Sequence, residues 1–285
     1  MQNHNNIAKQ PTPHTRITAK SPSLGASLAE VWRYRQLLIT FAKRDYKVRY
    51  AQTLLGFSWS FIQPLASVVV LYFIFQRVMK VPTGNISYLP FALSGLIFWN
   101  YFQSVVTQAS ASLIGNQSII RKIYFPRLTL PLSRAIVTLV EPLVAALLFI
   151  IALLYFNEGS WFAALSFIPL LALTALAALG LGLWSSALSI RFRDLQQAIP
   201  FALQMLFFAT PIAYSSSLLR KISPANADYL LYLNPLTGII ETFRHLVFGT
   251  NLSPHVWISV LLAFCLFASG LIYFQKVERK IADIV

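Results

Sequence analysis

Charge is scarce in this chain, and negative charge is the scarcest. Asp, Glu, Lys and Arg make up 11% of its 285 residues, whereas an average soluble domain carries roughly 25%. Only nine residues are acidic, against 23 that are basic, while 56% are hydrophobic. A soluble domain of this length would need more polar surface to cover so apolar a core. The composition therefore excludes an ordinary soluble protein.

Groups that support catalysis are also few. The sequence contains no G-x-x-x-x-G-K-[ST] loop and no Gly-rich turn after a strand, so it has no nucleotide-binding signature. Outside the N-terminal tail the histidines are His245 and His255, and no paired carboxylates lie in a plausible site. The single cysteine, Cys265, lies in an apolar run and cannot form an internal disulfide. We expect a non-enzymatic chain that binds no metal or cofactor of its own.

What the chain does have is a series of long apolar stretches without charge. Each is long enough to hold the roughly 20 residues that cross a bilayer as a helix. Backbone groups inside a bilayer must be satisfied internally, which favours helices. The sequence predicts an all-α integral membrane protein with about six transmembrane helices, near residues 54–76, 88–112, 131–155, 162–190, 196–214 and 255–275.

The basic residues indicate the orientation of these spans. Of the 23 Lys and Arg, 18 fall in the N-terminal region, the 113–134 loop, the 191–195 turn and the C-terminal tail. The positive-inside rule places these segments in the cytoplasm, so both termini are expected there. The same rule explains the net charge of +14 better than binding to nucleic acid, which we do not expect as a partner.

The N-terminal region divides into two parts. Residues 1–26 are polar and proline-containing, and they predict a disordered tail without a cleavable signal peptide before a transmembrane domain at 27–285. Ser27 and Glu30 fit a capping box, with Ser27 as the N-cap of the first helix. From there to Tyr50, apolar and basic residues separate onto two sides, which predicts an amphipathic helix in the membrane surface. By itself this pattern also fits a solvated, lipid-attracted anchor.

The connection at about 215–254 is too apolar for a simple external loop. After Asn234-Pro235, apolar residues repeat at helical spacing, and Glu241 and Arg244 interrupt them. Such a helix is too short and too charged to span, so we interpret it as re-entrant or interfacial.

Two further features concern the spans themselves. Glu141 is the ionisable residue well inside a span, which is a functional hypothesis by default. We favour a structural carboxylate, with Arg134 two turns away as its candidate partner. In the fourth span, small residues repeat every four positions and predict close helix packing, at Thr174, Ala178, Gly182 and Ser186.

Two cytoplasmic segments mix basic and aromatic residues. They are Arg121–Arg127, between the second and third spans, and Arg191–Asp194, after the fourth. They fit either positive-inside anchors or docking surfaces for a soluble partner.

The residues before the first span carry a more specific resemblance. The run Arg44-Asp45-Tyr46-Lys47-Val48-Arg49-Tyr50, followed by Leu54-Leu55-Gly56, Trp59 and Gln63-Pro64-Leu65, resembles the signature of type-2 ABC exporter membrane subunits. The resemblance is closest to permeases that export O-antigen, capsule or teichoic-acid polymers. Segment Arg121–Pro126, turn Arg191–Asp194 and Asn234-Pro235 fall in matching places, and the long N-terminal extension departs from the pattern.

The resemblance implies a homodimer with two cytoplasmic ABC ATPase subunits that bind the ATP and Mg. It implies export of a lipid-pyrophosphate-linked polysaccharide across the bacterial inner membrane. By position, a surface gate helix would be 27–50, coupling helices about 115–127 with 191–195, and a re-entrant hairpin 215–250. The expected coupling residues are Arg121, Lys122, Tyr124, Phe125, Pro126, Arg127, Arg191, Arg193 and Asp194.

The expected head-group and gate residues are Lys43, Arg44, Asp45, Lys47 and Arg49. Arginine binds phosphate oxygens in bidentate fashion, so Arg44 and Arg49 would capture the head group while Asp45 orients one of them. Alternatively, these residues only set topology. Two other functions stay open, namely a type-2 exporter of teichoic acid, a drug or a small lipid, and an ion-coupled secondary transporter. The last would need more ionisable groups at mid-membrane.

Overall fold

The computed structural model describes residues 24–51, 53–216 and 227–284, and every regular element in these ranges is helical. This confirms the all-α fold. The predicted tail lies outside the described residues up to position 23. The helices are α1 (Leu24–Arg33), α2 (Arg35–Tyr50), α3 (Trp59–Leu71), α4 (Tyr88–Ala111), α5 (Gln117–Ile120), α6 (Thr129–Val137), α7 (Val140–Phe156), α8 (Phe167–Arg191), α9 (Leu195–Ala209), α11 (Ala227–Tyr232), α12 (Pro235–Phe248) and α13 (Val256–Ile284).

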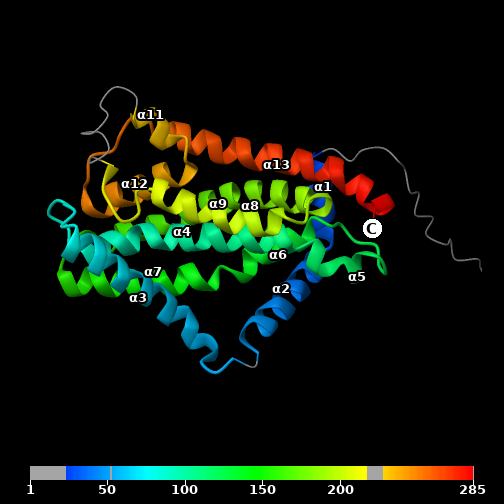
Figure 1. Cartoon of the computed structure of the whole chain (residues 1–285), viewed down its shortest axis with the longest axis horizontal. Helices are drawn as coiled ribbons and strands as arrows, with labels where there is room; N and C mark the ends of the chain where they lie inside the picture. Colours follow the sequence, from blue (N-terminus) through cyan, green and yellow to red (C-terminus); the bar gives the residue numbers. More distant parts are fainter. Residues whose placement is uncertain (1–23, 52, 217–226, 285) are drawn as a thin grey trace, which may run out of the picture.

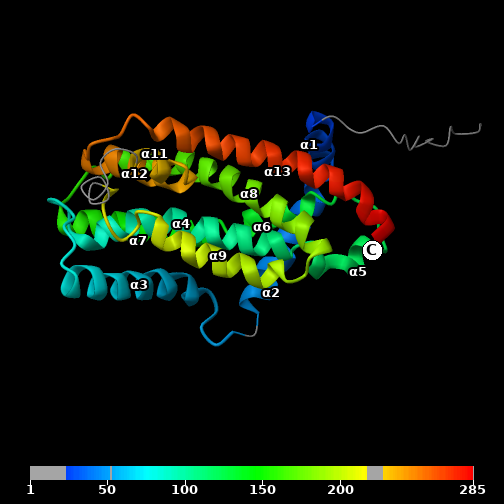
Figure 2. The same cartoon turned by 45° about the horizontal axis from the view of Figure 1, so that its top comes forward.

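The long helices lie side by side around α4 (Figures 1 and 2). Within the described residues, five stretches are long and apolar enough to cross a membrane: Gly56–Val78, Tyr88–Ala111, Thr129–Phe156, Ala163–Arg191 and Val256–Glu278. The first consists of a 3₁₀ turn, α3 and a π-helical turn at Tyr72–Val78. The fifth expected span, near 196–214, corresponds to α9, which is apolar but shorter.

Helix α9 ends five residues before the predicted boundary at 214. Its 15 residues rise about 22 Å, less than the roughly 30 Å of a bilayer core. The reason is Pro211, because the residue before a proline is pushed out of helical geometry, and Thr210 is extended with φ −93° and ψ 135°. Arg244 of α12 donates hydrogen bonds to the carbonyls of Pro211 (2.7 Å) and Ile212 (2.8 Å), which follow the end of α9.

The third expected span, 131–155, is divided between two helices. Helix α6 ends at Val137 and α7 begins at Val140. Pro142 has no N–H to donate to the carbonyl of Thr138, and the N–H of Glu141 donates to that carbonyl instead, at 3.3 Å. The break turns the chain between the two helices, and this change of direction matters for the charges described below.

Small residues let α8 pack closely against its neighbours, as the sequence predicted. Thr174, Ala178 and Ser186 are fully buried. A Cβ built on Gly182 would lie 2.7 Å from the Cβ of Ala109 in α4. On another side of α8, Gly180 contacts Gly270 of α13. The two backbones are so close that a Cβ built on Gly270 would lie 2.3 Å from the carbonyl oxygen of Gly180.

The N-terminal amphipathic segment forms two helices that meet at Tyr34. They run obliquely across the end of the bundle where α13 finishes (Figures 1 and 2). Helix α1 begins at Leu24, so the predicted N-cap at Ser27 is wrong, because Ser27 already lies inside the helix. The predicted apolar side is confirmed, since Val31, Phe41 and Ala42 are buried.

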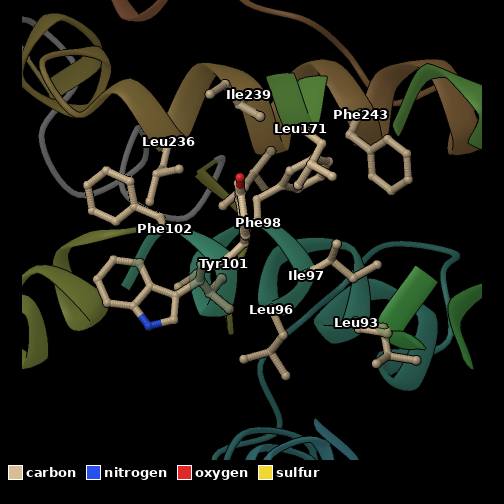
Figure 3. Close-up of a cluster of buried hydrophobic side chains, with 14 of the residues drawn as sticks. Leu93, Leu96, Ile97, Phe98, Tyr101, Phe102, Leu171, Leu236, Ile239 and Phe243 are labelled. Atoms are coloured by element: carbon tan, nitrogen blue, oxygen red, sulfur yellow. The ribbon is translucent and has the colours of Figure 1, made fainter. Parts of the chain in front are cut away.

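Helix α12 confirms the helix expected after Asn234-Pro235. The side chain of Asn234 accepts a hydrogen bond from the N–H of Leu236 at 3.0 Å, and Gly249 ends the helix with φ 69°. The apolar side chains of α12 pack against the aromatic side chains of α4 in the main core (Figure 3). Residues 217–226 of the predicted 215–250 hairpin lie outside the described part.

Candidate functional site

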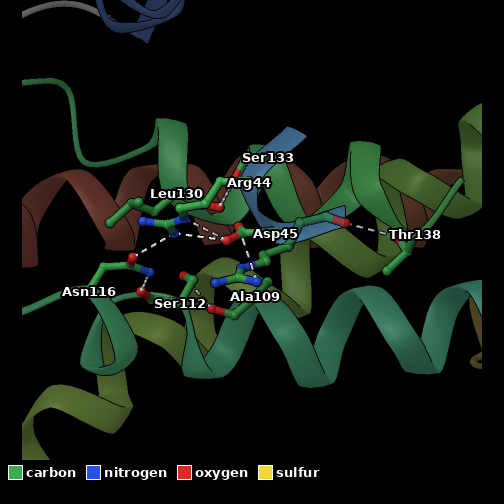
Figure 4. A network of polar contacts seen from close by, with 9 residues as sticks. Arg44, Asp45, Ala109, Ser112, Asn116, Leu130, Ser133 and Thr138 are labelled. Carbon is green, nitrogen blue, oxygen red and sulfur yellow. Dashed lines mark hydrogen bonds and ion pairs between the residues drawn. The ribbon is translucent and has the colours of Figure 1, made fainter. Parts of the chain in front are cut away.

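Asp45, on α2, is buried at the centre of a charge cluster (Figure 4). Arg44 donates from Nε and Nη2 to Asp45 Oδ1, at 3.0 and 2.8 Å. Nη1 of Arg134 on α6 lies 3.1 Å from Asp45 Oδ2. Arg44 Nη2 also donates to Oδ1 of Asn116 at 2.9 Å, and Asn116 Nδ2 donates to the carbonyl of Ser112 at 2.8 Å. The ion pair between Asp45 and Arg44 is therefore present, as the sequence predicted.

Glu141, on the first turn of α7, has a different partner from the one predicted. Its carboxylate is ion-paired with Arg49 at the end of α2 and accepts a hydrogen bond from Ser104 Oγ of α4 at 2.9 Å. The prediction of a partnered structural carboxylate fits, but the choice of Arg134 was wrong. Arg134 lies on α6, before the break, and pairs with Asp45, whereas Glu141 lies after the break, on α7.

These two ion pairs have opposite polarity. Helix α2 contributes an acid at Asp45 and, one turn later, a base at Arg49. The bundle contributes a base at Arg134 and then an acid at Glu141. Sliding α2 along the bundle would bring like charges together, which costs free energy. The pairs therefore fix the register of α2 against α6 and α7.

An open groove runs between α2 and the α6–α7 segment. Its volume is about 870 Å³, and its apolar lining includes Ile39, Ile136, Val137 and Val140. Its basic lining consists of Lys43, Arg44 and Lys47. Lys43 and Lys47 are exposed and have no acidic partner among the described residues, whereas Arg44 is half-buried and already paired. Each basic group near an anionic membrane surface contributes about 1 kcal/mol of attraction.

The expected coupling segments lie together at one end of the bundle, beside the end of α13 (Figures 1 and 2). Instead of one helix over 115–127, the chain forms a 3₁₀ turn at Ile114–Asn116, the four-residue α5 and an irregular stretch. Of the expected coupling residues, the exposed ones are Arg121, Lys122, Tyr124, Arg191, Arg193 and Asp194. Tyr124 is the most prominent aromatic group, with 85% of its surface exposed.

Phe125, Pro126 and Arg127 differ from that expectation. Phe125 is 4% exposed and packs on Phe41 of α2, with ring centroids 5.5 Å apart. Pro126 is buried too, and Arg127 donates from Nη1 to the carbonyl of Glu278 in α13 at 2.7 Å. Phe125 and Pro126 therefore offer no side chain to a partner, which corrects their predicted role. They connect the coupling segment to α2.

Sequence reasoning missed a polar face on α4. Asn100, Gln103, Ser104, Thr107 and Gln108 recur at helical spacing and, with groups from α3 and α7, line a cavity of about 240 Å³. A neighbouring groove of about 680 Å³ shares three of its lining residues and continues between α3, α4 and α9. The signal was available as the i, i+3, i+4, i+7, i+8 spacing. Uncharged amides and hydroxyls do not interrupt an apolar span as charges do, so a pattern of charge alone does not reveal this face.

The model of the ABC-2 type transporter family matches residues 36–248 of this chain. The chain belongs to the ABC-2 type transporter family. The matched range extends from α2 to α12 and so contains the charge cluster, both coupling segments and the polar face of α4.

Several proteins similar to this chain are named for the export of polysaccharides. The chain is 31% identical over 257 residues to an O-antigen export system permease protein of Klebsiella pneumoniae, which covers 87% of this chain and 95% of the relative. It is 27% identical to the corresponding Myxococcus xanthus protein, over 88% of this chain and 96% of the relative. A polysialic acid transport protein of Escherichia coli is 26% identical, over 78% of this chain and 85% of the relative. The ABC-2 membership confirms the resemblance found in the sequence.

Proposed function

We propose that this ABC-2 protein forms, as a homodimer with two cytoplasmic ABC ATPase subunits, the channel that exports a lipid-linked polysaccharide of the O-antigen or capsule type. The names of its relatives support the substrate class, since they refer to O-antigen and polysialic acid. The distribution of basic residues supports a bacterial cytoplasmic-membrane location with both termini in the cytoplasm.

The groove along α2 is the observation that carries the proposal. A lipid-linked glycan brings an acyl chain and a phosphate-bearing head group to the cytoplasmic leaflet. The groove offers an apolar lining to the acyl chain, and the basic residues Lys43 and Lys47, which help to line it, suit the head group. In this arrangement Arg44, held by Asp45, contributes a fixed guanidinium, and Arg49 is engaged with Glu141. This revises the expectation that the two arginines alone capture the head group.

The groove between α3, α4 and α9 supports a second copy of the chain. Gln63 on α3 and Gln204 on α9 both line it, and both are exposed. An amide left facing lipid is expensive, because hydrocarbon offers no hydrogen-bond partner. Exposed apolar side chains flank these amides, including Val70 and Phe201. A second protomer against this face would enclose a polar passage and remove the amides from lipid.

The exposed coupling residues support an ATPase partner. They gather at the end of the bundle that the positive-inside rule places in the cytoplasm. A soluble ATPase could reach Tyr124 and the 191–194 turn there. Aromatic and arginine side chains are the groups that most often dominate the energy of such interfaces.

A paired substitution tests the export proposal. Lys43→Gln combined with Lys47→Gln removes the free charges of the groove without touching the buried pairs. Glycan on the cell surface should fall several-fold, while lipid-linked glycan accumulates inside. Lys276→Gln, at the exposed cytoplasmic end of α13, is the control and should export normally. Normal export by the double variant at matched expression would contradict the role of the groove.

A further inference from the structure

The cavity of about 240 Å³ beside Glu141 has an unusual lining for a membrane-spanning region. Its polar groups come from three helices: Ser60 and Gln63 of α3, Glu141 of α7, and the polar face of α4. Yet α4 is the most buried of the five candidate spans. Polar side chains inside a membrane protein are costly to keep and commonly mark a substrate pathway.

Several of these groups have unused hydrogen-bonding capacity. Within the described residues, the side chains of Gln63, Asn100, Thr107 and Gln108 have no hydrogen-bond partner in the protein. By contrast, Gln103 accepts from Trp99 Nε1 at 2.8 Å, and Ser104 donates to Glu141. The first set can therefore donate to or accept from a ligand without breaking a contact of the fold.

The chemistry of the lining discriminates between ligand classes. No Lys or Arg is among the lining residues, whereas Glu141 is, so a phosphate would meet a carboxylate without a cation in the lining. Among the described residues no group of three or more His, Cys, Asp or Glu could hold a metal ion. An acyl chain would leave the amides and hydroxyls unsatisfied. A ring with many hydroxyl groups suits it, because each hydroxyl both donates and accepts.

The lining also has apolar positions suited to such a ring. Pro64, Ile97, Pro142 and Ala145 complete the cavity and could contact the C–H faces of a sugar. The adjoining groove shares Gln63, Asn100 and Gln103 with the cavity and adds the aromatic rings of Trp99 and Phe207. A saccharide bound in the cavity could therefore continue into the groove along one helix face.

We propose that the α3–α4–α7 cavity binds a neutral pyranose unit of the exported glycan within each protomer. The carboxylate of Glu141 accepts hydrogen bonds from its hydroxyls, and the amides of Asn100 and Gln108 donate to them or accept from them. The ion pair with Arg49 holds the carboxylate at the site. This proposal rests on the proposed function and adds a saccharide site that is separate from the basic groove of α2.

Cysteine protection in whole cells tests the site. Cys265→Ala removes the single native thiol, and Thr107→Cys or Asn100→Cys then places a thiol in the cavity. N-ethylmaleimide labelling is compared in cells that make the lipid-linked glycan, cells that make only the carrier lipid phosphate, and cells that make neither. We expect labelling in the two glycan-free strains and several-fold slower labelling when the glycan is present. Ser160→Cys, in the exposed connection after α7, should label equally in all three.

Three results would overturn the site. They are equal labelling in all strains, protection by the carrier lipid alone, and no labelling of either cavity cysteine in glycan-free cells. Surface glycan measured in the same strains separates this from the export proposal. If the wild-type chain restores export but the cavity thiols are unprotected, the cavity is not a saccharide site. If it restores no export, the proposed function itself fails.

A second measurement does not depend on the introduced thiols. Asn100→Leu and Gln108→Leu keep the bulk of the side chains but remove their hydrogen bonds, so each should reduce surface glycan several-fold. Ser185→Ala, on α8 outside the cavity, should leave export unchanged, since that hydroxyl only bonds to the carbonyl of Leu181. Normal export by both leucine variants would argue against the site.

Discussion

Arg49, in the last turn of α2, is ion-paired with Glu141 in the first turn of α7, 92 residues further along the chain. The pair ties the segment just before the first span to the middle of the third. One helical turn earlier on α2, Asp45 makes the reciprocal pair with Arg134. The amphipathic helix is thus fastened to the bundle by side chains of both signs.

The first prediction reverses this pair. Arg49→Glu alone, or Glu141→Arg alone, should lower the free energy of unfolding by roughly 1–3 kcal/mol, because each leaves a half-buried charge beside a like charge. The combined exchange should recover most of that loss. Thermal unfolding of the detergent-purified protein measures it. Losses that simply add in the double variant would show that the two residues do not interact.

The second prediction separates two neighbouring aromatic residues. Phe125→Ala should destabilise the protein by roughly 3–5 kcal/mol, as expected for a buried phenylalanine. Tyr124→Ala should leave unfolding unchanged, since the ring is exposed, but should reduce coupling of ATP hydrolysis to export. Parallel unfolding and ATPase–export measurements on the two variants check this. Equal stability losses would contradict the packing, and full coupling in Tyr124→Ala would leave this segment as a membrane anchor.

The third prediction concerns the arginines of α2. Arg44→Lys keeps the positive charge, but an ammonium cannot hold Asp45 and Asn116 together as the guanidinium fork does. Arg44→Lys and Arg49→Lys should insert with normal topology and export less glycan. Topology is read from cysteine accessibility and export from surface glycan. Full export by both variants at matched expression would restrict these residues to setting topology.

The sequence identified the architecture because hydrophobic length and charge asymmetry are local quantities. The spans, the amphipathic segment and the helix after Asn234 depend on periodicity that a single chain displays. Partners of charged residues are not local. Their two-turn spacing makes Arg134 and Glu141 candidate partners, but each pairs with a residue of α2 instead. Likewise, the sequence cannot show that Phe125 faces inward while Tyr124 faces outward.

The role of Arg244 illustrates the same limit. In the sequence it is a charge that interrupts an apolar helix. In the structure it is buried and donates to Ser94 Oγ and to the carbonyls of Phe91, Pro211 and Ile212. Burial lowers the pKa of Arg244, and the nearby Glu241 and Tyr88 act against that shift. Such a role depends on where α9 ends.

The fourth prediction tests the close contact between α8 and α13. Gly270→Val should weaken the α8–α13 contact strongly, because a Cβ there would lie 2.3 Å from the backbone of Gly180. Gly115→Ala is the control, since a Cβ at Gly115 meets nothing within 4 Å. The temperature of thermal unfolding should fall markedly for Gly270→Val and change little for Gly115→Ala. Equal stability of the two would contradict the packing of α8 on α13.

ATP-driven export of glycan is the central claim, and reconstitution tests it most directly. The purified chain, its ABC ATPase and a lipid-linked polysaccharide are placed together in sealed vesicles with the ATPase facing outward. We predict that glycan becomes protected inside the vesicles only when ATP and both proteins are present, and that the chain alone hydrolyses no ATP. Robust ATP hydrolysis by the chain alone, or glycan transfer that needs no ATPase, would contradict the account.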